Sequence, residues 1–403
     1  MDPRRNPFAP GAGSKPPEFA GRDELIEDAD IAFDRLLNGL HANSLFLLGL
    51  RGVGKTVLLN TLRDKALEKG VETVRIEVPD SEGGHLAREI VPELATIVRR
   101  LDRRHEVRER VAEAAGALRN FASAFRVRYE GLELGIEPET VEAGSGTLEY
   151  DMPALLRATA VAAKSRGGAV GLFIDEIQYL TREELAALAR SCHEAAQSGL
   201  PLLVVGTGLP QVAALAGEAK SYAERLFEYP EVGPLGAEAS RRVLREPIRR
   251  FEADITDPAL DRIVEDTAGY AYFLQTWGKF AWQVAEGEMI TEDDVEAALP
   301  DIRTHLDRHF FRVRFDRCSE LEQMYLRAMA ELGAGRHRSG DIARTRGTES
   351  PQVATVRKKL IQAGMIYSQR HGETAFTVPL FDEFMKRAMP ELIPYKPRRR
   401  RRS

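Results

Sequence analysis

The sequence contains very little cysteine and no long hydrophobic run. Cys192 and Cys318 are its only cysteines among 403 residues, which excludes a disulfide framework and a zinc site built from cysteines. No apolar run is long enough to cross a bilayer, and the Pro- and Gly-rich N-terminus lacks the apolar core of a signal peptide. We therefore expect a protein of the reducing cytoplasm with no membrane partner.

A net positive charge is lacking over most of the chain and occurs only at one end. Residues 318–403 hold 17 of the 57 basic residues and 9 of the 62 acidic residues, a balance of +8. The rest of the chain has a balance of −13, because it holds 40 basic and 53 acidic residues. Such an asymmetry predicts a polyanionic partner for the C-terminal segment.

A phosphate-binding loop is the clearest motif. The pattern G-x-x-x-x-G-K-T lies between an apolar stretch typical of a buried strand, 44–48, and a stretch typical of a helix, 57–62. Its glycines let backbone N–H groups face a phosphate chain at a helix N-terminus. Lys55 is expected to reach the β- and γ-phosphates, and the Thr56 hydroxyl to bind Mg²⁺. The nucleotide-binding residues expected here are Gly49, Leu50, Arg51, Gly52, Val53, Gly54, Lys55, Thr56 and Val57.

A second apolar stretch, 169–174, ends in an acidic pair. Asp175 is expected to bind Mg²⁺ through its water shell, and Glu176 to polarise the attacking water as a general base. A third apolar stretch, 201–206, is followed by Thr207, which either senses the γ-phosphate or marks a plain strand–turn junction. Arg225 is a candidate arginine finger that stabilises charge on the transferred phosphoryl group, with a salt bridge as the alternative.

Upstream of the loop, an aromatic residue and a Gly-Arg pair precede the first expected helix. We predict that Phe19, Gly21 and Arg22 hold the adenine, although the same residues also suit an ordinary helix entry. The predicted fold class is α/β: a P-loop NTPase with a parallel sheet flanked by helices, an all-α lid subdomain and a C-terminal winged helix-turn-helix. The predicted parts are a disordered or loosely docked arm (1–17), an ATPase core (18–235) with inserted helices and a hairpin (about 107–150), a helical lid and linker (236–316), a winged-helix domain (317–392) and a basic tail (393–403).

The winged-helix domain is predicted from its order of helix, helix, helix and hairpin. Its third helix, which Ser350 and Pro351 open, can enter a DNA major groove while phosphate contacts fix the register. Protein contacts are the alternative, because many winged helices bind no nucleic acid, and the excess of basic charge favours DNA. The candidate DNA-binding residues are Gln352, Thr355, Arg357, Lys358, Lys359 and Arg370. The tail 398–402 suits DNA, RNA or an acidic protein.

These motifs, in this order, make the chain similar to AAA+ ATPases. It resembles the initiator-like branch, and also the archaeal-type and STAND ATPases that use the same core as a nucleotide-controlled switch. The resemblance covers about residues 17–390. In initiator-type members a lid helix opens with Gly-Asn-Pro-Arg, whereas residues 269–272 here read Gly-Tyr-Ala-Tyr, without the arginine. Because of this departure, the chain resembles the STAND ATPases more than the initiator-type members.

The resemblance and the motifs together predict an ATP- and Mg²⁺-dependent ATPase that couples nucleotide state to DNA binding. A homo-oligomer is expected in the ATP state, with Arg225 of a neighbouring subunit completing each site. The alternative is a signalling or scaffold switch with slow hydrolysis, whose winged helix holds an unknown protein partner. A regulator of a mobile element or of phage defence is a further hypothesis.

Overall fold

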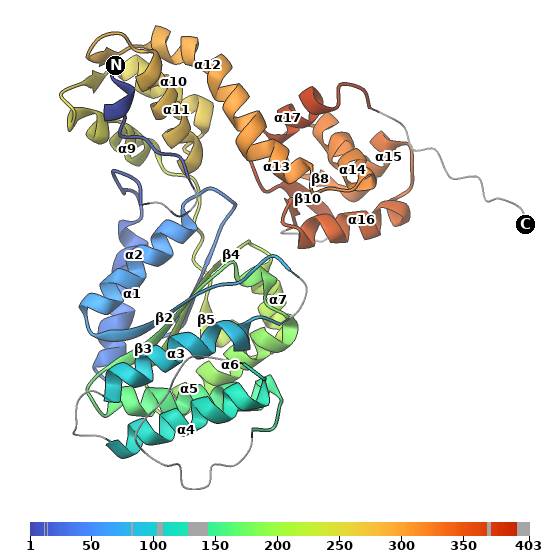
Figure 1. Ribbon diagram of the computed structural model, residues 1–403. Helices are drawn as coiled ribbons and strands as arrows, with labels where there is room; N and C mark the ends of the chain where they lie inside the picture. The colour runs from blue at the N-terminus through green and yellow to red at the C-terminus, as the bar shows by residue number, and fades with distance from the viewer. Residues whose placement is uncertain are drawn as a thin grey trace, which may run out of the picture. The chain divides into compact units, whose positions relative to one another are not determined.

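The computed structural model describes residues 1–11, 13, 15–81, 84–102, 108–127, 144–368 and 372–392 (Figure 1). The chain divides into two compact units. The sheet unit comprises Gly21–Gly49 and Gly54–Gly233, and the helical unit comprises Met1–Ala20, Leu50–Val53 and Pro234–Ser403. Within the described residues, no helix has the length and apolar character that crossing a membrane requires.

The sheet unit contains five parallel strands in the order β2-β3-β4-β1-β5. Three central strands are buried along their whole length, as expected for parallel strands that are covered on both faces. The bounds are β1 Ser44–Leu48, β2 Val71–Glu77, β3 Ala169–Asp175, β4 Leu202–Gly208 and β5 Phe227–Glu228.

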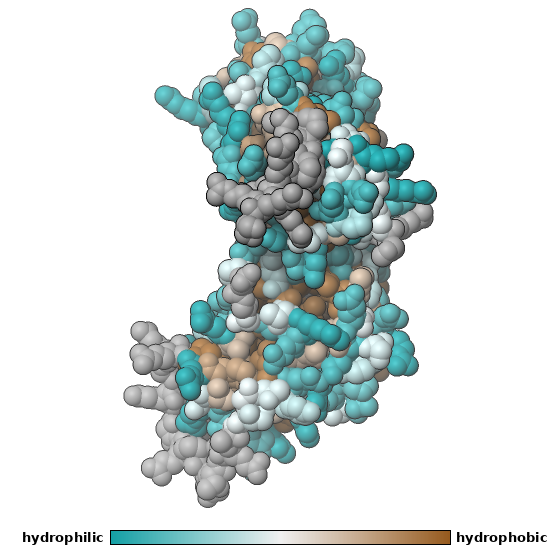
Figure 2. Space-filling view, turned by 90° about the vertical axis from the view of Figure 1, so that its right-hand side faces the viewer, coloured by the Kyte–Doolittle hydropathy of each residue, from teal (hydrophilic) through white to brown (hydrophobic). Residues whose placement is uncertain are grey.

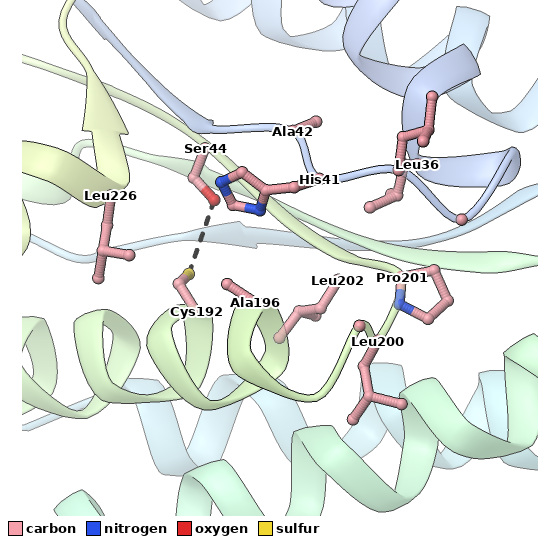
Figure 3. A pocket seen from close by; sticks show the side chains of 13 residues that line it. Leu36, His41, Ala42, Ser44, Cys192, Ala196, Leu200, Pro201, Leu202 and Leu226 are labelled. Carbon is pink, nitrogen blue, oxygen red and sulfur yellow. Dashed lines mark hydrogen bonds between the residues drawn. The ribbon is translucent and has the colours of Figure 1, made fainter.

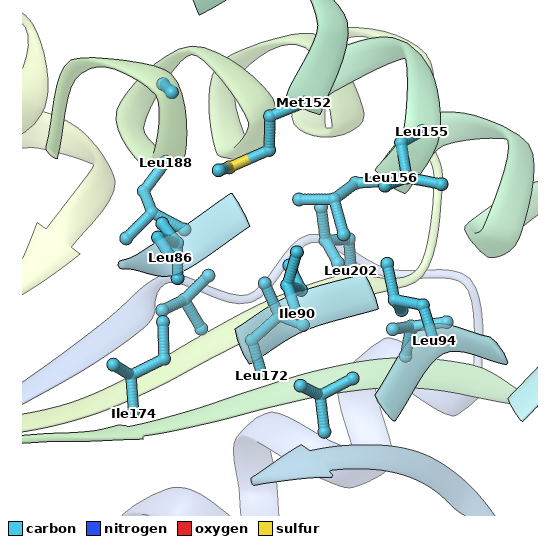
Figure 4. Packing of buried hydrophobic residues seen from close by; sticks show 14 of the residues in the cluster. Leu86, Ile90, Leu94, Met152, Leu155, Leu156, Leu172, Ile174, Leu188 and Leu202 are labelled. Atoms are coloured by element: carbon cyan, nitrogen blue, oxygen red, sulfur yellow. The ribbon is translucent and has the colours of Figure 1, made fainter. Parts of the chain in front are cut away.

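Helices cover both faces of this sheet, because successive residues of a strand point to opposite sides. Leu172 and Ile174 of β3 pack with leucines and isoleucines of α3, α5 and α6 (Figure 4). Phe173, between them, contacts Phe33 of α1 on the other face, with ring centroids 6.2 Å apart. The helices are α1 Asp23–Leu37, α2 Lys55–Glu68, α3 Leu86–Asp102, α4 Arg108–Ala124, α5 Leu148–Lys164, α6 Arg182–Gln197, α7 Val212–Ala219 and α8 Ala223–Leu226. The predicted hairpin of the insert falls largely on 128–143, outside the described residues.

The helical unit begins its regular structure with four helices joined by short connections. They are α9 Ala237–Arg249, α10 Asp257–Thr267, α11 Ala271–Val284 and α12 Glu292–Leu306. Two short strands, β6 Asp254–Ile255 and β7 Met289–Ile290, pair in parallel between them. A π-helical turn, Asp307–Phe311, and α13 Arg312–Phe315 follow α12. The predicted lid is therefore helical, but it is not all-α, because it also contains this two-stranded sheet.

The N-terminal arm is docked on these helices rather than disordered. Phe8 is 3% exposed, and its ring lies so close to Gly278 of α11 that a Cβ there would be 2.8 Å from it. Asn6 donates to the Lys279 carbonyl at 2.8 Å, and the Trp282 indole donates to the Asp2 carbonyl at 2.9 Å. The composition of the arm suggested disorder, but one aromatic side chain and a few backbone partners are enough to hold it.

The C-terminal part of the helical unit has the winged-helix arrangement. Helices α14 Glu320–Glu331, α15 Ser339–Arg346 and α16 Ser350–Gln362 precede the strands β9 Ile366–Tyr367 and β10 Glu373–Phe376. A strand before α15, β8 His337–Arg338, adds to the hairpin and gives an antiparallel sheet in the order β8-β10-β9. A final helix, α17 Phe381–Ala388, packs its phenylalanines against Phe311.

Candidate nucleotide and metal site

The polar residues at the carboxyl ends of β1, β3 and β4 lie at one edge of the parallel sheet. Thr207 of β4 pairs in register with Leu47 of β1, one residue before the strand end, and Gly206 pairs with Ile174 of β3. The Gly49 N–H, which opens the phosphate-binding loop, donates to the Gly208 carbonyl at 3.0 Å. The carboxyl ends of parallel strands therefore bring together three segments that are far apart in the sequence.

Asp175 has both carboxylate oxygens engaged. Its side chain is buried, with Oδ1 accepting hydrogen bonds from the Thr207 hydroxyl and from the Glu176 N–H at 3.0 Å. Oδ2 lies 3.2 Å from the Arg75 guanidinium, which also donates to Asn60 at 3.1 Å. Arg75 comes from β2, whose residue Glu77 pairs in register with Asp175. The predicted site residues Asp175 and Thr207 are thus in direct contact, and Arg75 is an additional member.

Glu176 has a backbone conformation that is rare for a residue with a side chain. Its φ and ψ are 56° and 40°, in the left-handed region that favours glycine. Immediately after it, residues Ile177–Tyr179 form a single 3-10 turn. Gln178 in this turn donates to the Glu176 carboxylate and accepts from the Leu209 N–H at 3.1 Å. Strained backbone of this kind concentrates at functional sites.

The phosphate-binding loop leads directly into α2. Gly52 and Gly54 have φ values of 86° and 94°, which a residue with a Cβ would adopt only under strain. Lys55 is the first residue of α2 and is buried, and the Thr56 side chain is half-buried in the same turn. A glycine-rich turn that leads into a helix N-terminus is the arrangement that binds phosphate.

The tip of the loop, Leu50–Val53, is grouped with the helical unit and packs on the stretch that lacks the lid arginine. The Tyr272 N–H donates to the Gly52 carbonyl at 3.1 Å. The buried Tyr270 ring leaves no room for a side chain at Gly52, since a Cβ there would lie 2.8 Å from it. Tyr272, at the position of the missing arginine, stacks on Phe310 at 4.5 Å. Tyrosines thus lie against the tip of the loop, at the stretch where the resemblance led us to look for an arginine.

An arginine from another helix lies close to the same tip. The Arg314 guanidinium of α13 covers the Phe310 ring at 4.1 Å. Burial, followed by the nearby charge of Arg51, lowers the pKa of Arg314 to about 10.

Arg22 is buried at the start of α1, and its guanidinium donates to the Gly233 carbonyl at 2.5 Å. Burial lowers the pKa of Arg22 below its usual value. Gly21 precedes it with φ of 71°. Phe19, the other predicted adenine contact, is half-buried in the helical unit. The structure thus gives Arg22 a local role in joining the entry of α1 to the segment after β5.

Arg225 is exposed on the four-residue helix α8. Among the described residues, its guanidinium makes no hydrogen bond or ion pair with a carboxylate. The alternative was a surface or interface salt bridge. A surface salt bridge within the chain is not formed among the described residues, and the interface salt bridge remains an alternative.

Thr355, Lys358 and Lys359 of α16 are exposed, as predicted for residues that contact DNA. Gln352 is exposed but belongs to the capping box at the start of α16, where its side chain accepts from the Glu349 N–H at 3.2 Å. Arg357 turns toward the hairpin instead, donating to the Ser368 hydroxyl at 2.8 Å and to the Glu373 carbonyl at 3.3 Å. Arg370 and the basic tail lie outside the described residues.

The residues at the sheet edge fit a magnesium ion. A hydroxyl from Thr56 and a carboxylate from Asp175 are the hard oxygen donors that Mg²⁺ prefers, with water and phosphate oxygens supplying the rest. The Arg75 guanidinium on Asp175 shows that this carboxylate already accommodates a cation. No cluster of three His, Cys, Asp or Glu side chains suited to a metal occurs among the described residues, so a cage made of protein ligands alone is excluded there.

A small pocket lies away from this site, where β1 and β4 begin (Figure 3). Leu36, Leu200 and Leu202 contribute to its lining, and Ser44 contacts Cys192 at 3.6 Å. Because the phosphate-binding loop follows the other end of β1, this pocket is separate from the nucleotide site.

Sequence reasoning missed Arg75 and Gln178. A signal for Arg75 existed, because a charged residue between Val74 and Ile76 is unusual in a parallel strand. Gln178 carried no comparable signal, since its contacts with Glu176 and Leu209 arise only when β3 and β4 lie side by side.

Comparison with known proteins agrees with this geometry. Residues 18–205 match the model of the AAA ATPase domain, and residues 308–385 match that of a domain of unknown function, DUF8462. No curated protein matches the chain.

The Walker-type ATPase PABY2304 of Pyrococcus abyssi is similar in structure, with a TM-score of 0.58 and 18% identity over 91% of this chain and 95% of that one. The ORC1 protein of Aeropyrum pernix, solved in complex with DNA, has a TM-score of 0.46 and 17% identity over 96% of both chains. The family match and the first of these likenesses confirm the predicted fold class.

Proposed function

We propose, from the premise that residues 18–205 are an AAA ATPase domain, that this protein is a Mg²⁺-dependent ATPase that couples nucleotide state to DNA binding. One observation carries the enzymatic part. The phosphate-binding loop, Asp175–Glu176 and Thr207 follow strands whose carboxyl ends meet at one edge of the sheet. Hydrogen bonds join these segments through Gly49, Gly208, Thr207 and Asp175.

Each residue then has a defined part in hydrolysis. The loop N–H groups and Lys55 would bind the phosphates, and Thr56 with Asp175 would hold the metal ion, which would neutralise phosphate charge. Glu176 accepts a proton from the attacking water. Thr207 orients Asp175, and Arg225 from a neighbouring subunit stabilises the transferred phosphoryl group. Figure 2 shows hydrophobic residues gathered on one face of the sheet unit, which supports such a neighbour.

The DNA part of the proposal is supported by charge and exposure on the winged helix. Residues 318–403 carry 17 basic and 9 acidic side chains, and Lys358 and Lys359 are exposed on α16. Because Arg357 and Gln352 have intramolecular partners, few side chains of α16 remain to read bases. We therefore propose binding dominated by phosphate contacts, with weak sequence preference.

Binding and turnover of ATP test the enzymatic part. Lys55→Ala is expected to abolish binding of a fluorescent ATP analogue, because the phosphates lose their cation. Glu176→Gln is expected to leave binding unchanged and to lower turnover at least about 100-fold, the scale of a lost general base. Lys164→Ala, on the distant end of α5, is the matched control. Wild-type turnover in the Glu176→Gln variant would refute the role given to Glu176.

DNA affinity measured against salt tests the coupling. We expect the affinity for random duplex DNA to fall steeply as the salt concentration rises. In Lys359→Ala, the slope of log affinity against log salt concentration should be smaller in magnitude by about 1. Lys386→Ala removes the same charge from α17 and is the control. Affinity that does not change between the nucleotide-free and analogue-bound protein would contradict coupling.

A second function, a scaffold switch that holds a protein partner, is favoured by one observation. Leu321 and Leu332, three turns apart at the two ends of α14, are 52% and 38% exposed. Absence of DNA binding at low salt, with turnover intact, would favour this alternative over the first.

A further inference from the structure

Gln178 bridges two segments of the candidate site that carry different functions. Its side-chain amide donates to the Glu176 carboxylate, and its side-chain oxygen accepts from the Leu209 N–H, two residues beyond Thr207. The orientation of the amide is fixed, because a backbone N–H can only donate and an ionised carboxylate can only accept. Gln178 can bridge the two segments because its side-chain amide has both a hydrogen-bond donor and an acceptor.

The strand β4 is shaped to receive the turn that carries Gln178. A Cβ at Gly208 would lie 2.8 Å from Ile177 and 3.0 Å from the Gln178 oxygen, and a Cβ at Gly206 would lie 3.0 Å from Ile177. Any side chain at these two positions would push the 3-10 turn away from the strand. Two glycines at alternate positions thus let the turn lie directly on β4.

The backbone of Glu176 makes such a support necessary. Its left-handed conformation costs free energy, of the order of 1–3 kcal/mol, and persists only when its surroundings hold it. The Asp175 carboxylate accepts a hydrogen bond from the Glu176 N–H, and the Gln178 amide donates one to the Glu176 carboxylate. Asp175 and Gln178 are in turn bonded to the end of β4. The Thr207 hydroxyl donates to Asp175, and the N–H of Leu209, the residue after β4, donates to Gln178.

We propose that Gln178 is a positioning residue that fixes the Glu176 carboxylate relative to the end of β4, so that the base and Thr207 move together. This inference rests on the proposed hydrolysis of ATP. One carboxylate oxygen of Glu176 is held by Gln178, and the other is left to accept a proton from water.

Two substitutions separate positioning from a structural role. Gln178→Met keeps the length and removes both hydrogen bonds. Gln178→Glu keeps the acceptor for Leu209 but replaces the donor to Glu176 by a second negative charge. Turnover, the KM for ATP, the affinity for an ATP analogue and the melting temperature are measured for each, with Gln197→Ala on α6 as the control.

We expect both variants to lower kcat at least about tenfold at unchanged KM and analogue affinity, the scale of a misplaced base. In Gln178→Glu the acidic limb of the pH–turnover profile is expected to move to higher pH, because two adjacent carboxylates retain a proton more strongly. If Gln178→Glu has the wild-type kcat and pH profile, the positioning role is overturned. A wild-type protein without turnover overturns the proposed function, and this inference with it.

Discussion

Arg75 and Thr207 hold opposite oxygens of one buried carboxylate. Thr207 donates to Oδ1 of Asp175, whereas Arg75 places a positive charge 3.2 Å from Oδ2. A metal ion that approaches this carboxylate meets a guanidinium already on it. Under the proposed function the two cations compete, and the arginine compensates the buried charge of Asp175 in the absence of a metal.

Removing the competing charge is expected to favour the metal. In Arg75→Gln, nucleotide binding should reach half its maximum at a Mg²⁺ concentration about tenfold lower or less, since a charged hydrogen bond is worth about 1.5–3 kcal/mol. The measurement is a Mg²⁺ titration at a fixed concentration of fluorescent ATP analogue. Arg63→Gln, which removes an equal charge from α2, should behave like wild type, and an unchanged midpoint in Arg75→Gln would contradict the competition.

Cys192 gives a prediction on pH. Burial raises the pKa of this thiol to about 11, well above that of an unfolded cysteine. Folding thus favours the neutral thiol, and its stabilising effect is complete below pH 9 and is lost as the pH rises toward 11. At pH 8 we expect mass spectrometry to find Cys192 unalkylated in the native protein and alkylated in denaturant. Alkylation of native protein at the denatured rate would contradict this burial.

At the scale of elements, the N-terminal arm and α11 form one packed layer. Phe8 fills a space that exists because position 278 is a glycine, and α11 also bears Tyr272, which bonds to the tip of the phosphate-binding loop. The arm thus supports the back of a helix whose first turn touches the loop.

Truncating this contact should destabilise the helical unit. Phe8→Ala is expected to lower its free energy of unfolding by about 3 kcal/mol, the usual cost of removing a buried phenylalanine ring. Gly278→Ala should act in the same direction, by pushing Phe8 away. Thermal denaturation measures both, and Arg4→Ala, on an exposed residue of the same arm, serves as the control. An unchanged melting temperature in Phe8→Ala would show that the arm does not contribute to folding.

In the whole molecule, negative charge predominates before residue 318 and positive charge after it. Arg225 makes no hydrogen bond or ion pair with a carboxylate among the described residues. An exposed arginine of this kind suits a site completed by a second copy. If Arg225 acts in a neighbouring subunit, two different inactive variants should restore each other when they are mixed.

Mixing Glu176→Gln with Arg225→Ala tests this expectation. Each variant alone should bind the ATP analogue and turn over poorly. In the mixture, sites that combine an intact Glu176 with a partner's intact Arg225 should recover up to about a quarter of wild-type turnover for random pairing in dimers. Arg182→Ala, on α6, replaces Arg225→Ala in the control mixture. Mixtures no more active than the sum of their parts would place Arg225 outside the catalytic site.

Local patterns in the sequence were enough to predict the secondary structure and the segments that carry the candidate site. Continuous apolar runs specified β1, β3 and β4, because strands buried on both faces need no polar positions. The glycines of the phosphate-binding loop and the acidic pair Asp175–Glu176 could be recognised in the sequence, because their chemistry depends on residues that are neighbours in the chain. The three helices of the winged helix were equally local, since each has its own caps and apolar face.

Which of those residues meet, and which partners they have, depends on the packing of segments that are far apart in the sequence. Arg75 reaches Asp175 across 100 positions, and Gln178 reaches Leu209 across 31, through strand pairings that no local pattern encodes. The inward turn of Arg357 and the docking of Phe8 depend in the same way on distant partners. Side-chain type and spacing fix what a residue can do, whereas packing between distant segments fixes what it faces.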